Sequence, residues 1–116
     1  MTVCEPRNLA YAQRFASEYI LRAPPSPNLS TMQEETIAQI CDVLQTKGAF
    51  LLGDATGVGK GRTIAGVVRE RLAIRPSQSV VWISANMRLK DDAAAECSTL
   101  AIPNEPGNRV VFTSYV

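Results

Sequence analysis

The stretch FLLGDATGVGKGRTIAGVV, residues 50–68, joins a short apolar run to an apparent helix. It holds five glycines and one lysine, Lys60, which stands where the helix pattern begins. Backbone N–H groups of a glycine-rich turn at a helix N-terminus form a concave anion site, and the helix dipole adds partial positive charge there. The stretch therefore predicts a loop that binds a polyphosphate.

The glycines and the lysine match the phosphate-binding motif G-x-x-x-x-G-K-[ST] imperfectly at both ends. Asp54 stands in place of the first glycine, and Gly61 stands where the motif has a hydroxyl residue that holds magnesium. Thr63 is the nearest replacement, either as a Mg²⁺ ligand or as a threonine that bonds back to a helix carbonyl. A dinucleotide fingerprint fails because its third glycine position is Arg62. The motif favours a nucleoside triphosphate over NAD.

We expect ATP to contact the loop and the first turn of the helix after it. Glycines without a Cβ let phosphates come close to the backbone, and the lysine reaches the β- and γ-phosphates. The predicted contacts are Thr56, Gly57, Val58, Gly59, Lys60, Gly61, Arg62 and Thr63, with Lys60 as the catalytic residue. A turn that binds nothing explains the stretch less well, because each glycine costs about 1 kcal/mol.

Composition restricts the class of protein. The chain has 116 residues, of which 46% are hydrophobic and 20% charged, enough for one small core. A net charge of +1 provides no global field, so nucleic acid would have to be held by a local patch. No run approaches the roughly 20 apolar residues of a membrane span, and the first residues lack a signal-peptide pattern. We expect a cytoplasmic protein, nuclear if eukaryotic, with no membrane partner.

The chemistry-bearing residue types exclude several enzyme classes. Cys4, Cys41 and Cys97 are odd in number and widely spaced, which fits neither a disulfide framework nor a zinc site. We expect reduced thiols, two of them buried. The sequence contains no histidine, which excludes Ser-His and Cys-His pairs and histidine-ligated metals within this chain.

Hydrophobic periodicity divides the chain into two parts. Residues 8–21 predict a short amphipathic helix, and residues 22–29, which hold three prolines, predict a linker. Residues 1–29 therefore form an N-terminal extension. From residue 30 the spacing of Ser30 and Gln33 matches a capping box and predicts a helix that ends at Gly48.

The rest of the chain alternates strands and helices. We expect strands over 49–53, 79–84 and 109–115, and helices over 59–74 and 87–102. This order predicts an α/β fold, a three-layer sandwich with a parallel sheet, over residues 30–116. The glycine loop lies at the carboxyl end of the first strand, where open α/β sheets bind ligands.

The run GKGRTIAG closely resembles the ATP-binding motif of the Strawberry notch family, helicase-like ATPases of superfamily 2 in which a glycine also follows the lysine. LSTMQEETI, SANMRLKDDAAAE and VVFTSYV are similar to flanking segments of the same proteins, so the resemblance covers residues 29–116. It implies a P-loop NTPase fold of the RecA-like type, incomplete here, corresponding to the amino-terminal part of the first RecA-like domain.

The resemblance also implies roles for individual residues. Gln33 would read the adenine edge of ATP, although completing the capping box explains the same glutamine equally well. Asn86, Arg88 and Lys90 would contact phosphates of a nucleic acid, by analogy with motif Ia of helicases. A mixed, solvated surface is the alternative, because two aspartates at positions 91 and 92 follow directly.

The resemblance is compatible with two functions, because the matched segment holds only part of the ATPase. The first is the ATP- and Mg²⁺-binding segment of a helicase-like ATPase that acts on nucleic acid, DNA rather than RNA. Its acidic motif and second domain are expected beyond Val116, in a C-terminal half or partner subunit, so the isolated chain would be inactive. The second is a non-enzymatic nucleotide-binding or protein-interaction module. A small-molecule kinase is weaker still, because this length leaves little room for a lid and an acceptor site.

Overall fold

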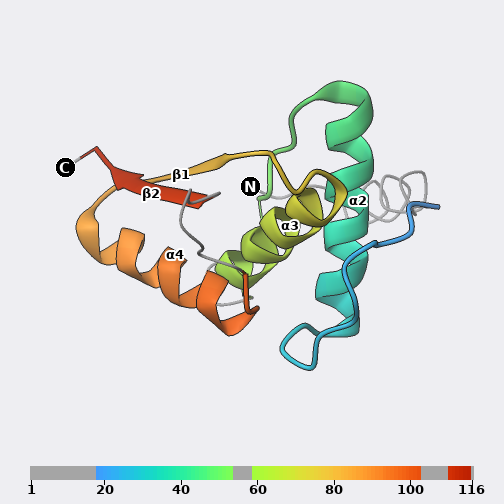
Figure 1. Cartoon of the computed structure of the whole chain (residues 1–116), viewed down its shortest axis with the longest axis horizontal. Coiled ribbons are helices and arrows are strands. Elements are labelled where there is room, and N and C mark those ends of the chain that lie inside the picture. Colours follow the sequence, from blue (N-terminus) through green and yellow to red (C-terminus); the bar gives the residue numbers. More distant parts are fainter. Residues whose placement is uncertain (1–17, 54–58, 103–109, 116) are drawn as a thin grey trace.

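A computed structural model describes residues 18–53, 59–102 and 110–115 of the chain. They contain three helices and two strands, with two helices in succession before the first strand (Figure 1). In chain order they are α2 (Thr31–Lys47), α3 (Lys60–Ile74), β1 (Val80–Ser84), α4 (Met87–Thr99) and β2 (Val110–Ser114). The strands pair in parallel from Val80 against Val110 to Ser84 against Ser114, and α4 makes the connection between them. This arrangement confirms the α/β fold class.

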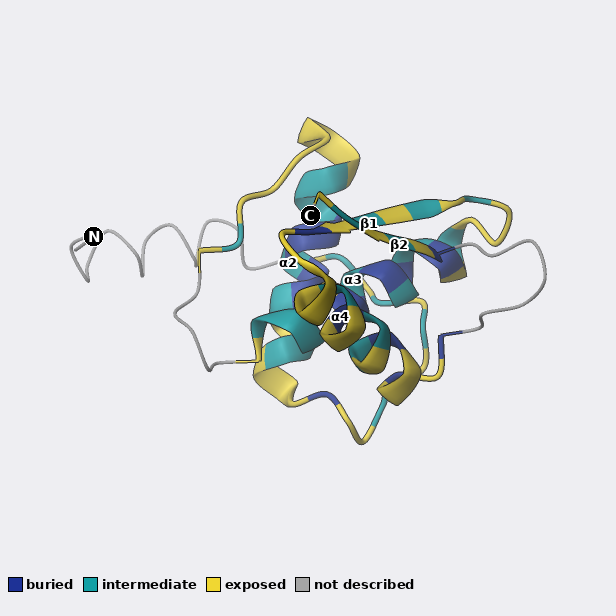
Figure 2. Ribbon diagram, turned by 90° about the vertical axis from the view of Figure 1, so that its left-hand side faces the viewer, coloured by how far each residue is buried: buried dark blue, intermediate teal, exposed yellow. Residues whose placement is uncertain are grey.

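The elements form a series of layers. Helix α4 packs against both strands, α3 packs against α4, and α2 packs against α3. The core between them is apolar and includes Leu29, Ile37, Ala65, Leu72 and Val110. On the opposite face of the sheet, Val81, Ile83 and Val111 are 60%, 58% and 47% exposed. Figure 2 shows exposed positions along both strands. The sheet is therefore covered on one face by the described residues.

Helix α2 begins and ends as its sequence predicts. The Ser30 side chain accepts a hydrogen bond from the backbone N–H of Gln33, and the Gln33 side chain accepts one from the backbone N–H of Ser30, each at 3.0 Å. Gly48 ends the helix in the left-handed conformation at φ 81°, which glycine adopts without strain. The capping box is thus confirmed.

Helices α2 and α3 approach each other closely at Gly66. A Cβ placed on Gly66 would lie 2.2 Å from Cδ1 and 3.0 Å from Cγ1 of Ile37, and 3.7 Å from Leu29. Both side chains are buried. Contact of this kind requires a residue without a side chain, so Gly66 sets the distance between the two helices.

Two predicted elements are wrong in the described residues. The helix expected over 8–21 does not include residues 18–21, because the chain there is extended and the N–H groups of Arg22 and Ala23 donate to the Glu70 carboxylate. Residues 8–17 lie outside the described part. The strand expected over 49–53 does not form, and Leu51 is 91% exposed, so the run lacks the packing of a buried strand.

The helix α4 is shorter than predicted. It ends at Thr99 rather than at residue 102, because Ala101 adopts φ 55°, outside the helical range. In the described residues no helix is long and apolar enough to cross a bilayer.

Cys41 and Cys97 are buried free thiols, as expected, and Cys4 lies outside the described residues. Burial, with a smaller contribution from Glu70, raises the pKa of Cys41 to about 12. Burial, with a smaller contribution from Glu96, raises the pKa of Cys97 to about 11. The folded chain therefore keeps both thiols protonated at pH values where free thiols ionise.

We expect the free energy of unfolding to fall as the pH rises above about 9. The unfolded chain then loses thiol protons that the folded chain keeps, up to about pH 11 for Cys97 and about pH 12 for Cys41. Urea unfolding across this range measures the slope. In a Cys41→Ala/Cys97→Ala chain the free energy of unfolding should fall less steeply with pH, because the contribution of the two thiols is gone. A fall due to Tyr19 should remain, because burial also raises the pKa of Tyr19. Equal slopes in the two chains would contradict the expectation.

Candidate functional site

Helix α3 begins without a side-chain cap, unlike the other two helices in the described part of the chain. The N-caps of α2 and α4, Ser30 and Asn86, accept hydrogen bonds from the backbone N–H groups of Gln33 and Leu89. The N-cap of α3 is Gly59, which has no side chain and makes no capping bond. The first N–H groups of a helix have no intrahelical acceptor, so an anionic ligand can take the place of the cap.

The carbonyl of Gly59 is a junction between α2 and α3. It accepts hydrogen bonds from Thr63 N at 3.0 Å, Thr63 Oγ1 at 3.1 Å and Gln33 Nε2 at 3.3 Å. Gly59 has φ 78°, and a Cβ on it would lie 2.6 Å from Gln33 Nε2. Glycine is therefore required here both by the left-handed backbone and by the closeness of Gln33. The role of Gln33 toward adenine stays a prediction.

A cleft of about 680 Å³ opens beside the start of α3. Lys60 and Gly61 line it from α3, Ser84 lines it from the end of β1, and Asp92 and Glu96 line it from α4. The cleft thus lies at the carboxyl end of a parallel strand, where α/β sheets bind ligands.

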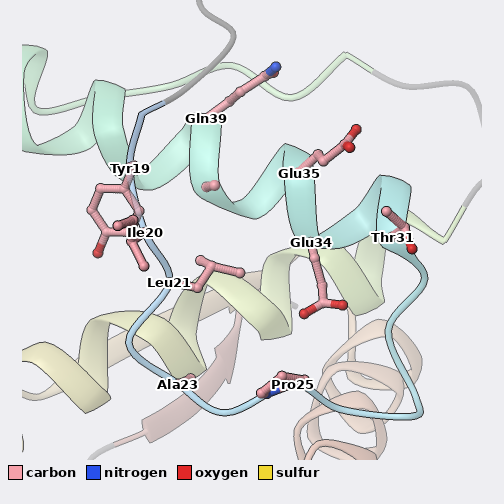
Figure 3. A pocket seen from close by; sticks show the side chains of 10 residues that line it. Tyr19, Ile20, Leu21, Ala23, Pro25, Thr31, Glu34, Glu35 and Gln39 are labelled. Carbon is pink, nitrogen blue, oxygen red and sulfur yellow. The ribbon is translucent and has the colours of Figure 1, made fainter.

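A second cleft, of about 650 Å³, lies between the extended residues 19–25 and α2 (Figure 3). Its polar groups include the carboxylates of Glu34 and Glu35. None of the described residues that line it is a lysine or arginine. The cleft beside Lys60 also holds two carboxylates, those of Asp92 and Glu96, but it adds a lysine, so a phosphate is better accommodated there.

Arg62 ties the start of α3 to two other parts of the chain. Its Nε donates to Glu96 Oε1 at 3.0 Å, and its Nη1 donates to the Asn28 carbonyl at 2.9 Å. A Cβ on Gly61 would lie 3.5 Å from Glu96 Oε2, an ordinary contact. Glu96 was not among the predicted site residues, because pairing between distant helices leaves no local signal in the sequence. The predicted contact of Arg62 with ATP stays a prediction.

Thr63 is engaged within its own helix. Its hydroxyl donates to the Gly59 carbonyl, and the residue is 3% exposed. This is the helix-carbonyl bond that the second interpretation of Thr63 predicts. The described residues contain no group of three or more His, Cys, Asp or Glu side chains able to hold a metal. A Mg²⁺ ion would therefore depend on phosphate oxygens, water and groups outside the described residues.

We expect Thr63→Val to leave the magnesium dependence of nucleotide affinity unchanged. Valine keeps the shape and removes a hydroxyl that already bonds to Gly59. Nucleotide titrations across a range of Mg²⁺ concentrations test this, with Gly61→Thr, which restores the common motif, as the comparison. Loss of the Mg²⁺-dependent part of the affinity in Thr63→Val would identify the hydroxyl as a metal ligand.

Four further residues were predicted to contact ATP or nucleic acid. Thr56, Gly57 and Val58 lie outside the described residues, so their contacts with ATP stay predictions. Asn86 caps α4, its Oδ1 accepting from Leu89 N at 2.9 Å.

The other residues predicted to contact nucleic acid lie at the start of α4. Arg88 and Lys90 lie in its first turn. Ser84 and Ser114, in register at the carboxyl ends of the strands, lie at the same edge of the sheet. The structure thus gathers these residues at one edge, and their contact with nucleic acid stays a prediction.

Comparison with known proteins identifies the family. The sequence model described as P-loop containing NTP hydrolase pore-1 matches residues 1–110. The chain is 40% identical to Protein strawberry notch homolog 2 of Mus musculus over 93 residues, which are 73% of this chain and 7% of that protein. Protein strawberry notch homolog 2 of Homo sapiens is 43% identical over 65% of this chain and 6% of its own length. Protein strawberry notch of Drosophila melanogaster is 41% identical over 65% of this chain and 5% of its own.

The chain therefore spans a small fraction of the curated relatives that it matches. No solved structure matches it significantly. The family match extends over nearly the whole chain and agrees with the α/β fold, and the three relatives named above are all strawberry notch proteins. The chain belongs to the P-loop containing NTP hydrolase pore-1 family, among the Strawberry notch proteins.

Proposed function

We propose that the chain is the ATP-binding segment of a superfamily 2 helicase-like ATPase that acts on nucleic acid. The observation that carries the proposal is the uncapped start of α3, where Gly59 leaves N–H groups for a ligand and Lys60 lines the adjacent cleft. The helix dipole and the lysine both favour negative charge at this point. The P-loop family supports a nucleotide as the ligand.

The described residues of the site have different parts in this proposal. Lys60 supplies a positive charge for the β- and γ-phosphates, and the N–H groups of the first turn orient them. Gln33 holds the Gly59 carbonyl in place from α2. Mg²⁺, when bound with ATP, would neutralise phosphate charge. The nucleic acid would contact Asn86, Arg88 and Lys90 at the carboxyl edge of the sheet.

Titration of the 116-residue chain with a fluorescent ATP analogue, with and without Mg²⁺, tests the proposal. A site for polyphosphate predicts that ATP and ADP displace the probe and that adenosine does not, because the described site offers contacts to phosphate. Displacement by adenosine as effective as by ATP would contradict it.

The alternative is a protein-interaction module, and one observation favours it. Val81, Ile83 and Val111 form an exposed apolar face on the sheet, and such faces mark interaction surfaces. If the chain binds no nucleotide under any Mg²⁺ concentration, this alternative replaces ATP binding as the better account.

We expect the isolated chain to hydrolyse ATP negligibly. Phosphoryl transfer needs a placed metal, a group that orients the attacking water and usually an arginine finger. The described residues contain no carboxylate cluster for the metal. Phosphate release assays on the purified chain measure turnover, with Lys60→Ala as the control for contaminating ATPases. Steady turnover that Lys60→Ala abolishes would show that the chain carries its own acid.

A further inference from the structure

Glu70 of α3 is a buried carboxylate that binds the extended segment before α2. The residue is 1% exposed. Its oxygens accept hydrogen bonds from the Tyr19 hydroxyl at 2.8 Å, from Arg22 N at 2.9 and 3.0 Å, and from Ala23 N at 2.9 Å. A carboxylate taken out of water is costly unless such bonds replace its hydration. These bonds therefore fix the segment to the helix.

Two arginines of α3 hold the same segment further along. Arg69 Nη2 donates to the Pro24 carbonyl at 2.5 Å, and Arg62 Nη1 donates to the Asn28 carbonyl at 2.9 Å. We call residues 19–29 the strap. Its early residues lie beside the later part of α3 and its last residues beside the start of α3, so the strap runs antiparallel to the helix. Figure 3 shows it passing Ala23 and Pro25 on its way to α2.

The strap ends close to the start of α3, where we call Gly59, Lys60 and Gly61 the phosphate-binding turn. Ser30, directly after it, caps α2 and accepts from Gln33 N. Gln33 Nε2 then donates to the Gly59 carbonyl at 3.3 Å, one residue before Lys60. Gln33, which contacts the residue directly after the strap, thus also contacts the residue directly before α3.

We propose that the strap positions the phosphate-binding turn and that Glu70 is its anchor. Glu70 lies ten residues after Lys60 on α3, about 15 Å along a helix, so it is a positioning residue and does not touch the ligand. Releasing the strap loosens the Gln33–Gly59 contact and weakens nucleotide binding. The proposal rests on the proposed ATP-binding function.

The test compares Glu70→Gln and Tyr19→Phe in the 116-residue chain, with the exposed Glu35→Gln as matched control. Glutamine keeps the shape of Glu70 but replaces one acceptor oxygen by a donor. Phenylalanine removes the hydroxyl bond from the strap and leaves α3 unchanged. An effect of Tyr19→Phe on the turn therefore passes through the strap.

Amide hydrogen exchange and affinity for a fluorescent ATP analogue are the readouts. In Glu70→Gln we expect exchange about tenfold faster at Arg22 and Ala23 and about threefold faster at Thr63, whose N–H donates to Gly59, with the Cys97 amide of α4 unchanged. The dissociation constant should rise about three- to tenfold. Tyr19→Phe should act in the same direction, and Glu35→Gln should change nothing.

Faster exchange in the strap with no change at Thr63 or in affinity overturns the proposal. If Glu70→Gln also accelerates amide exchange at Cys97, that substitution destabilises the whole chain. Exchange at Thr63 and nucleotide affinity in Tyr19→Phe then decide whether the strap acts on the turn. If the unmodified chain binds no nucleotide, the proposed function fails, and exchange at Thr63 alone decides whether the strap is coupled to the turn.

Discussion

Lys60→Ala is expected to weaken binding of ATP by the chain at least tenfold. Lys60 lines the cleft at the uncapped start of α3, and under the proposed function its ammonium would make a charge-assisted contact with phosphate. Loss of such a contact costs roughly 1.5 to 3 kcal/mol, and 1.4 kcal/mol corresponds to a factor of ten. Competition titration against a fluorescent analogue measures the change.

Lys47→Ala is the matched control for Lys60→Ala. Lys47 lies in the last turn of α2 and is exposed, so its removal takes away the same charge without touching the cleft. Its affinity for ATP should stay within about twofold of the unmodified chain, since exposed charges far from a site are screened by salt. If Lys60→Ala and the unmodified chain bind ATP with equal affinity, the loop is not the phosphate-binding site.

Much of the fold is predictable because it depends on local signals. The capping box of Ser30 and Gln33 and the left-handed Gly48 set the ends of α2 through bonds between neighbouring residues. The apolar runs of β1 and β2 predict strands that the structure confirms. The run at 49–53 has the same apolar character but no strand forms, since a strand also depends on the neighbours with which it pairs.

The parts of the site that sequence analysis missed depend on distant contacts. Glu96 meets Arg62 from another helix, and Asn28 offers a backbone carbonyl, which has no sequence signature. In the sequence Glu70 lies between two arginines, a pattern typical of a solvated helix face. One sequence signal does indicate that Glu70 is buried. It follows Thr63 and Gly66 at helical spacing, and all three lie on the buried face of α3.

Gly66→Ala is expected to destabilise the chain by about 1 to 3 kcal/mol, the usual cost of overpacking a filled core. The new Cβ would lie 2.2 Å from Ile37 Cδ1. Ile37 is 1% exposed, so its side chain can move aside only by displacing the core residues around it. Intrinsic helix propensity predicts the opposite sign, because alanine is favoured over glycine by about 1 kcal/mol within a helix. The free energy of unfolding in urea therefore distinguishes the two effects.

Ile37→Val supplies the decisive second variant, because it removes the methyl group Cδ1 that the new Cβ would meet. Alone, it deletes a buried methyl and should cost about 0.5 to 1.5 kcal/mol. Combined with Gly66→Ala, it relieves the overlap, so the double variant should be more stable than Gly66→Ala alone. Gly53→Ala, where a Cβ meets nothing within 4 Å, is the control and should be nearly neutral. If Gly66→Ala stabilises the chain, α2 and α3 do not pack this closely, and the contact by which Gln33 of α2 holds Gly59 loses its structural basis.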